Sequence, residues 1–363
     1  MQRLDNSGAP ATIETRAGKI ASESFAGVIQ PRLGASRSEV LVGPQSGLDA
    51  GILDMGGDRV MAVTTDPFFV MPSLGWERAA WFAVHIVASD LCTTGLAPQF
   101  CAIDLNLPLN VSDADLATLW EGIDGACRQI GVAIVTGHTG RYEGCAFPTI
   151  GSATFMATGH RTEYITPAMA RPGDAVLLTK GAGIETAGMF GATFPRQLSV
   201  SIGSKLAVAA ENLFWQMSVV KDAITAARAG VREAGVSAMH DATERGVWGG
   251  LVEMAEASNV GMRIDQGAIA VPAPVRAICD LFDIDPYSTS SEGTLILTAR
   301  AHRTCNIIRR LEDEGVAAAV IGEVTDAGEG VTVLHDGFSQ PLRSPESDPF
   351  WPAFKMAMER WPE

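Results

Sequence analysis

The chain has 363 residues, of which 47% are hydrophobic and 19% charged. This composition excludes a disordered tail protein and a fibrous repeat, and the length favours two domains. Acidic residues number 42 and basic residues 27, so the formal net charge is −15. Such a charge repels nucleic acid and anionic membranes, and an acidic enzyme that handles phosphates needs a divalent cation beside its substrate. We therefore expect neither a nucleic-acid partner nor a membrane partner.

Three sequence features predict a cytoplasmic protein. The longest apolar run, which starts at Ala79, is interrupted by His85 and Asp90 and falls short of the roughly 18–20 residues of a membrane span. The first 19 residues contain no apolar segment typical of a secretory signal. The six cysteines form no C-x-x-C pair, so we expect reduced thiols.

The first predicted elements form a β-hairpin. Strands over 50–54 and 59–65 flank the turn 55–58, which contains two glycines. If the turn centres on residues 57–58, Asp49 and Asp66 are cross-strand partners, and if it centres one residue earlier they are diagonal neighbours. In both cases the two carboxylates stand about 5–8 Å apart at the same end of the hairpin.

Two helices and a glycine turn follow. The apolar spacing predicts a helix over about 76–93 with Asp90 near its C-terminus, and a second helix over 112–131. The second helix leads into an apolar strand, 132–136, and then into a predicted turn at 137–140 that offers backbone N–H groups to a phosphate. A further strand is expected over 149–159.

The second half repeats the alternation of strands and helices. A break rich in proline and glycine at 162–174 separates the halves, and it is followed by a strand at 174–179 and a glycine loop at 180–183. Further strands are expected over 288–298 and 315–325. We predict a mixed α/β fold with domains at 1–165 and 171–335 and a tail, 336–363, whose aromatic residues dock as a helix.

Three aspartates are the most informative candidates for chemistry. Asp49, Asp66 and Asp90 each lie where a regular element ends, and two carboxylates about 5 Å apart repel by roughly 3 kcal/mol at an effective dielectric constant near 20. A bound Mg²⁺ turns this repulsion into attraction. Alternatively, these residues end strands and cap a turn at the surface.

Two acidic residues of the second half leave the same choice open. Asp241 is predicted to stand at the start of a helix, where N-capping alone explains it, although glycines nearby also let an anion approach. Glu253 is expected to face solvent. Walker and dinucleotide-binding motifs, a serine-hydrolase elbow and histidines at metal-ligand spacing are all missing.

Eight segments in order resemble the superfamily of aminoimidazole ribonucleotide (AIR) synthetase. This PurM-like superfamily includes thiamine-monophosphate kinase, selenophosphate synthetase and the hydrogenase-maturation carbamoyl dehydratase. The segments are GPQSGLDAGIL, TTDPFFVMP, ASDLCTTGLAP, VAIVTGHTG, RPGDAVLLTKGAGIE, HDATERGVWGGLVEMA, SSEG and IGEV.

The resemblance implies a two-domain fold whose N-terminal domain forms a β-barrel across a homodimer, and an enzyme that uses ATP and Mg²⁺. Carried onto this chain, the metal ligands are Asp49, Asp66, Asp90 and Asp241, and the catalytic residues are Asp49, His138 and Glu253. The implied nucleotide contacts are Lys19, Gly137, His138, Thr139, Gly140, Lys180, Gly181 and Gly183. The activity expected is phosphorylation of a small substrate or of a carbonyl or amide oxygen.

Within the superfamily, TTDPFFVMP looks most like the hydrogenase-maturation (HypE-like) branch, which also suggests a maturation partner protein. That branch carries its carbamoyl group on a C-terminal cysteine, whereas no cysteine follows Cys305 here, and His138 replaces the family's aspartate in Gly-Asp-Thr. A kinase of the thiamine-monophosphate type and a non-catalytic maturation scaffold therefore remain alternatives.

Overall fold

The computed structural model describes residues 20 and 24–361. Residues up to Ser36 form a unit separate from the rest of the chain. Its described part contains a short π-helix, η1 (Phe25–Ile29), and the Arg32 guanidinium donates a hydrogen bond to the Val28 carbonyl at 2.9 Å. All the elements discussed below belong to the second unit, from Arg37 onward.

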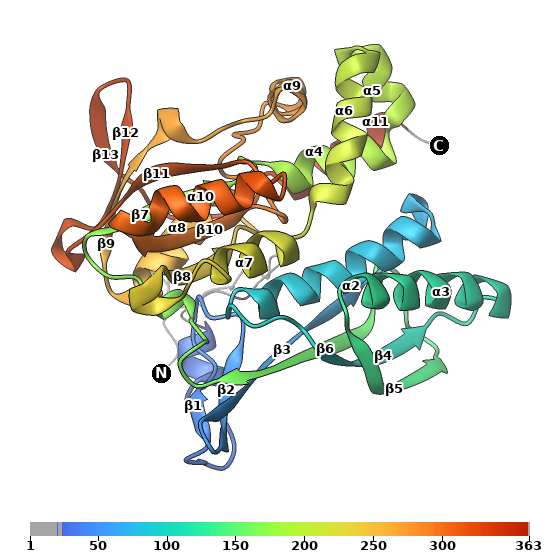
Figure 1. Cartoon of the computed structure of the whole chain (residues 1–363). Coiled ribbons are helices and arrows are strands. Elements are labelled where there is room, and N and C mark those ends of the chain that lie inside the picture. Colours follow the sequence, from blue (N-terminus) through green and yellow to red (C-terminus); the bar gives the residue numbers. More distant parts are fainter. Residues whose placement is uncertain (1–19, 21–23, 362–363) are drawn as a thin grey trace, which may run out of the picture. The chain divides into compact units, whose positions relative to one another are not determined.

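The first half of this unit is a six-stranded sheet with two long helices on one face (Figure 1). The strand order is β1-β2-β3-β6-β4-β5, and α2 and α3 bury their apolar sides on the sheet. Ser112 caps α3 in a reciprocal capping box with Asp115. The bounds are β1 Val40–Val42, β2 Gly51–Gly56, β3 Arg59–Phe69, α2 Trp76–Cys92, β4 Phe100–Leu107, α3 Asp113–Gln129, β5 Ala133–Arg141 and β6 Thr149–His160.

The β2–β3 hairpin has a bulge that decides how the two aspartates face each other. Gly56 pairs with Arg59 around the predicted turn, but the register shifts between Asp54 and Gly56, so that Gly51 pairs with Val63. A bulge adds one residue to one strand and moves every later pair by one position. Extended to Asp49, this register places Thr65 opposite Asp49 and Asp66 one position further along β3, which is neither of the two predicted arrangements.

The predicted turn at 137–140 is wrong, because these residues belong to strand β5. They pair in parallel with β4, Gly137 opposite Ile103 and His138 opposite Asp104. Backbone pairing with the eight-residue β4 therefore carries the strand past the end of its apolar run. Glycine is required at 137, since a Cβ atom there would lie 2.1 Å from the Ile103 carbonyl oxygen.

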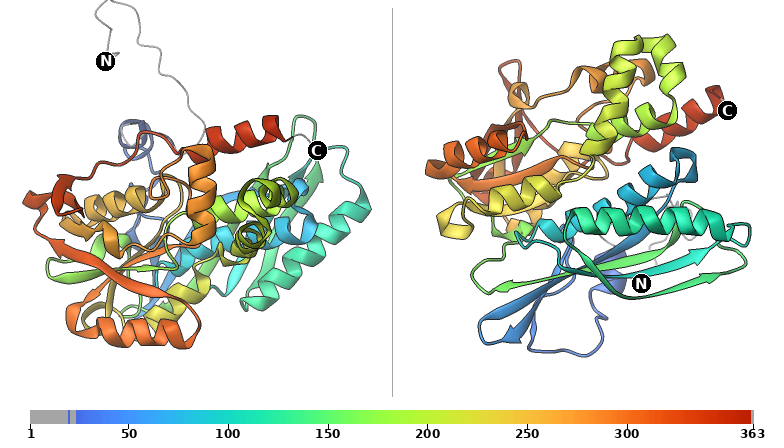
Figure 2. Two further views of the ribbon diagram at one scale, coloured as in Figure 1. Left: turned by 90° about the horizontal axis from the view of Figure 1, so that it is seen from above. Right: turned by 45° about the vertical axis from the view of Figure 1, so that its right-hand side comes forward.

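The second half is a seven-stranded sheet with helices on both faces (Figure 2). The strand order is β13-β12-β9-β11-β7-β10-β8; α7 and α10 pack on one face and α8 on the other. The bounds are β7 Asp174–Thr179, α4 Ile184–Thr193, α5 Pro195–Ile202, α6 Ser204–Leu213, α7 Val220–Ala227, β8 Val236–Asp241, α8 Gly246–Ser258, β9 Gly261–Asp265, α9 Ala273–Phe282, β10 Leu295–Arg300, α10 Thr304–Asp313, β11 Ala318–Thr325, β12 Val331–His335, β13 Phe338–Pro341 and α11 Phe350–Arg360.

The mixed α/β fold with two sheet-containing domains is thus confirmed. Only the short 3₁₀-helix η3 (Pro167–Met169) lies between the last strand of the first sheet and the first strand of the second. The domain limits 1–165, 171–335 and 336–363 stay predictions, as does the barrel across a dimer. The first strand after His335, β13, pairs with β12 and so belongs to the second sheet.

The aromatic tail docks as a helix, as predicted. Phe350 and Phe354 of α11 are buried against Phe190, with the Phe190 and Phe354 ring centroids 5.3 Å apart.

Among the described residues no helix has the length and apolar content to cross a membrane. All six cysteines lie in the described part of the chain and are free.

We predict that Phe354→Ala lowers the free energy of unfolding by about 3 kcal/mol, because truncating a buried phenylalanine removes apolar contacts and leaves a cavity. Met356→Ala is the matched control, since Met356 lies in the same helix and is 53% exposed. It should change stability by less than about 0.5 kcal/mol. Urea unfolding followed by tryptophan fluorescence measures both, and equal effects would contradict the docking of α11.

Candidate functional site

His240 joins the two halves of the chain at the centre of the site. It is buried near the end of β8, and its Nδ1 lies 2.8 Å from Oδ2 of Asp49, in the loop before β2. Its Nε2 lies 3.0 Å from Oε2 of Glu253 on α8. The other oxygen of Glu253 accepts a hydrogen bond from the Arg245 guanidinium. One imidazole therefore bridges carboxylates from the two domains.

These contacts favour the charged imidazole. Burial alone lowers the pKa of His240, but the carboxylates of Asp49 and Glu253 outweigh it and hold the pKa well above its ordinary value.

The expectation that Glu253 faces solvent is wrong, because its side chain is only 17% exposed and bonds both His240 and Arg245. The assignment of Glu253 as catalytic stays a prediction.

Asp241 ends strand β8 rather than starting a helix. Its partner across the sheet is Leu295 of β10, and α8 begins only at Gly246. The predicted helix start at 240 is therefore wrong, since pairing with β10 extends the strand through Asp241. Asp241 is buried, and one ligand atom each from Asp49, His240 and Asp241 lies within 4.8 Å of the others.

Asp90 lies near the C-terminal end of α2, as predicted, and faces the same cluster. Burial raises the pKa of its carboxyl well above the ordinary value, and the carboxylates that add to the effect are, in decreasing order, Asp241, Asp49, Asp66 and Glu292. Thr64 of β3 links two members, because its Oγ1 donates to the Asp49 carbonyl at 2.7 Å and lies 3.5 Å from Oδ2 of Asp90. The other three aspartates proposed as metal ligands thus all act on Asp90.

Glu292 is a member of this cluster that the sequence analysis did not single out. It is 2% exposed, and its Oε1 is buried with no hydrogen-bond partner among residues 20 and 24–361. Burial raises its pKa well above the ordinary value, and Asp241 and Glu185 raise it further. The signal was available, since an acidic residue in the middle of the strand-like run 288–298 is unusual unless it has a function.

The donor set fits a divalent cation. Magnesium takes oxygen ligands and prefers a few carboxylates together with phosphate oxygens. Here the carboxylates come from both domains, and one of their oxygen atoms, Oε1 of Glu292, has no hydrogen-bond partner in the described part of the chain. Buried like charges destabilise a protein unless a cation or protons neutralise them. The residues that would hold the ion are Asp49, Asp66, Asp90 and Asp241, with Glu292 beside them.

The predicted nucleotide contacts lie in several places. His138 is exposed on the edge strand β5, and its Nε2 lies 2.6 Å from the Tyr142 hydroxyl. The ammonium group of Lys180 lies 3.0 Å from Oδ2 of Asp222 and donates a hydrogen bond to the Ser218 carbonyl. The carboxylate of Asp222 therefore already balances its positive charge. Lys19 lies outside the described residues. The roles of these residues in binding ATP stay predictions.

The glycine loop that follows Lys180 is packed against neighbouring loops. A Cβ atom at Gly181 would lie 2.5 Å from the Ala270 carbonyl oxygen, and the Gly183 N–H donates to the Ser291 hydroxyl. Both glycines have positive φ angles. Their conformations and close contacts explain the glycines without a ligand.

The two sheets and the cluster of buried carboxylates between them define a two-domain α/β protein with a candidate cation site. Family models for AIR synthase related proteins match this chain over residues 47–157 (N-terminal domain) and 171–335 (C-terminal domain). The chain belongs to the AIR synthase related family. The resemblance derived from eight segments is confirmed.

Several curated relatives are enzymes of hydrogenase maturation. Carbamoyl dehydratase HypE of Azotobacter vinelandii is 30% identical over 67% of this chain and 68% of its own length. The protein of the same name from Cupriavidus necator is 28% identical over 81% of both chains. A selenide, water dikinase of Methanocaldococcus jannaschii is 28% identical over 81% of this chain and 84% of its own. The expectation of an enzyme and of a HypE-like branch is confirmed.

Solved structures share the fold. A HypE–HypF complex superposes with a TM-score of 0.67 and 21% identity, covering 89% of this chain and 98% of the other. HypE in complex with ATP superposes with a TM-score of 0.61 and 21% identity, covering 92% of this chain and 97% of the other. AaThiL complexed with AMPPCP and TMP superposes with a TM-score of 0.64 and 19% identity, covering 83% of this chain and 90% of the other.

We predict that His240→Gln changes the pH dependence of stability. Because the folded-state pKa of His240 is raised, its stabilising effect is complete below the ordinary histidine pKa of about 6.5 and is lost as pH rises through the folded-state pKa. The advantage of the wild type over the variant should therefore shrink with rising pH. Urea unfolding in EDTA over a series of pH values measures it. An advantage that grows with pH would contradict the charged imidazole.

Proposed function

We propose that the protein is an ATP- and Mg²⁺-dependent enzyme that transfers the γ-phosphoryl group of ATP to an oxygen atom of a small acceptor. The observation that carries this proposal is the convergence of buried carboxylates from both domains around Asp90. Phosphoryl transfer depends mainly on positioning and on neutralising phosphate charge, and a cation held by carboxylates serves both needs.

The reaction requires little covalent chemistry from the protein. The acceptor oxygen forms a bond to the γ-phosphorus, the bond from that phosphorus to the β,γ-bridging oxygen breaks, ADP leaves with the electron pair, and the acceptor proton passes to a base. Bound Mg²⁺ supplies charge neutralisation to the phosphates. An amide oxygen activated in this way becomes a good leaving group, whereas a phosphorylated hydroxyl is itself the product.

The protein residues have distinct tasks in this proposal. Asp49, Asp66, Asp90 and Asp241 hold the cation. His240 fixes the orientation of the Asp49 carboxylate through its 2.8 Å hydrogen bond, and Glu253 with Arg245 fixes His240 in turn. This arrangement matches the rule that ligating groups need an outer set of hydrogen-bond partners. We keep Glu253 and His138 as catalytic candidates, His138 through contact with a phosphate.

Relatives and structural neighbours support nucleotide use and assembly. One neighbour is a complex with ATP, and another is a complex with AMPPCP and TMP. We further propose that this protein works in the cytoplasm as a homodimer in which the N-terminal sheets of two copies form a barrel. A maturation partner protein is included in the proposal, since another structural neighbour is HypE bound to HypF.

We predict that Asp49→Asn and Asp241→Asn each weaken Mg²⁺-dependent ATP binding by at least about tenfold, because each removes one negative charge and one strong oxygen ligand from the cation site. Asp336→Asn is the matched control, since Asp336 is exposed in the β12–β13 turn. Titration calorimetry with ATP, with and without Mg²⁺, measures the affinities.

Unchanged ATP affinity in both cluster variants would overturn the proposed cation site. If the wild type binds no ATP, the maturation-scaffold alternative replaces the enzyme. Where ATP binds, ADP formation that depends on the acceptor demonstrates transfer. Accumulation of a phosphorylated acceptor then identifies a kinase, and release of phosphate with a dehydrated product identifies a dehydratase.

A further inference from the structure

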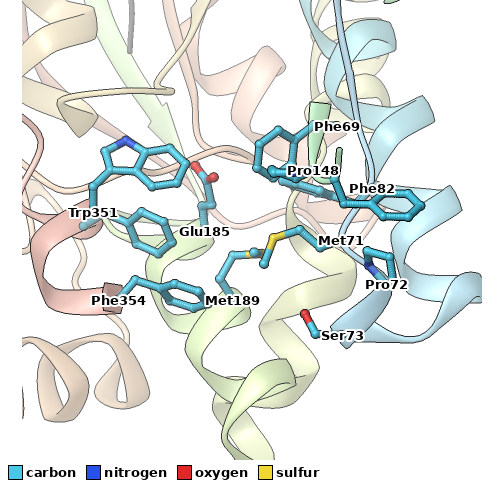
Figure 3. Close-up of a pocket in the computed structure, with 12 residues that line it drawn as sticks. Phe69, Met71, Pro72, Ser73, Phe82, Pro148, Glu185, Met189, Trp351 and Phe354 are labelled. Atoms are coloured by element: carbon cyan, nitrogen blue, oxygen red, sulfur yellow. The ribbon is translucent and has the colours of Figure 1, made fainter. Parts of the chain in front are cut away.

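A cavity of about 230 Å³ is lined mainly by aromatic and methionine side chains (Figure 3). Three parts of the chain line it. Phe69, Met71 and Phe82 come from the first domain, Met189 from α4, and Trp351 and Phe354 from the C-terminal helix α11. Pockets for drug-sized ligands usually measure about 300–1,000 Å³, so this cavity accommodates a smaller molecule built on a single ring.

Glu185 is the one ionisable side chain among the residues that line this cavity. It stands at the start of α4, and Figure 3 shows its carboxylate among the aromatic and methionine side chains. Its Oε2 accepts a hydrogen bond from the Glu292 backbone N–H at 3.1 Å. Glu185 therefore links the cavity to the loop that carries Glu292, a member of the carboxylate cluster.

The C-terminal helix is fixed to the same loop by one buried aspartate. Oδ1 of Asp348 accepts from the backbone N–H groups of Ser290 and Phe350. Its Oδ2 accepts from the Arg245 backbone N–H and from the Ser290 hydroxyl. Arg245 in turn bonds Glu253. These bonds place Trp351, one residue after Phe350, at a defined position in the wall of the cavity.

At alkaline pH the charge at the cavity selects against anions. Burial raises the pKa of Glu185 to about 8, and Asp348 and Glu244 add to the rise, so the side chain carries a full negative charge only above that pH; no basic residue of the described chain lines the space. A carboxylate or phosphate on the ring of a ligand would meet acidic groups in apolar surroundings, where uncompensated charge is costly. A group that donates N–H hydrogen bonds instead finds an acceptor at Glu185, and a flat ring finds aromatic walls.

We propose that this cavity binds the acceptor substrate, and that the acceptor contains a flat apolar ring with an N–H donor group and no anionic group at the end that enters the cavity. The role as acceptor rests on the proposed function. The binding preference does not, because it follows from the lining alone and is measurable without nucleotide. Trp351 and Glu185 are then the residues that determine specificity.

Three ligands of nearly identical shape test this preference. Benzamide presents an uncharged N–H donor, benzamidine a cationic one, and benzoate an anion without donors. We expect benzamide and benzamidine to bind at least about tenfold more tightly than benzoate, because only they satisfy Glu185. Ligand-detected NMR on the full chain at about pH 9, above the raised pKa of Glu185, and without ATP or Mg²⁺ measures the three affinities. Benzoate binding as tightly as the others would overturn the proposal.

Variants locate the binding to this cavity. Trp351→Ala should weaken the binding of benzamide and benzamidine by roughly three- to tenfold, because stacking on the indole ring is lost. Trp351→Phe should keep most of the wild-type affinity. Trp351 is 43% exposed, and Trp120→Ala on α3, where Trp120 is 38% exposed, is the matched control. Equal affinities in the Trp351→Ala and Trp120→Ala variants would place the ligands elsewhere and overturn the proposal.

Glu185→Gln provides the second and independent variant. An amide at this position both donates and accepts, so discrimination against benzoate should fall by roughly tenfold while the affinity for benzamide changes little. Unchanged discrimination would contradict the role of Glu185. The Asp241→Asn variant should bind these three ligands like the wild type, even if its affinity for ATP is lost. Failure of the nucleotide proposal and failure of the cavity proposal are therefore separable.

Discussion

The structure depends on how clustered carboxyl groups of two domains are held against one another. Asp49 and Asp90 come from the first domain, and Asp241 and Glu292 from the second. Their repulsion opposes close packing of the two halves, and His240 counteracts part of it by bonding Asp49 and Glu253 at once. The remaining imbalance needs protons or a cation, so the packing of the two domains depends on how these carboxylates are neutralised.

This linkage gives each surrounding element a task. Strand pairing with β10 brings Asp241 and His240 to the site, and α8 supplies the glutamate on the far side of the imidazole. Helix α2 supplies Asp90 from its last turn, where the helix dipole disfavours an anion. A carboxylate kept at such a position despite these costs is typical of a functional site rather than of a structural one.

The same loop serves the cavity and the cluster. Glu292 belongs to the cluster, its backbone N–H bonds Glu185, and Ser290 holds Asp348 before α11. An acceptor in the cavity and a phosphate beside the carboxylates would therefore contact neighbouring parts of one loop. In phosphoryl transfer most of the rate enhancement comes from such relative positioning. The C-terminal helix, although distant in sequence, contributes Trp351 and Phe354 to the cavity proposed for the acceptor.

The sequence by itself determined the mixed α/β fold, the family, the helix carrying Asp90 and the docking of the aromatic tail, because these follow from apolar periodicity and from ordered local motifs. Tertiary structure decided the rest. Pairing with β4 made a strand of residues 137–140, and pairing with β10 made Asp241 a strand end. Glu292 became buried, and Glu253 half-buried beside His240, only in the folded chain. Contacts between residues far apart in the chain leave no trace in local spacing, which is why the sequence indicated carboxylates but not which of them meet.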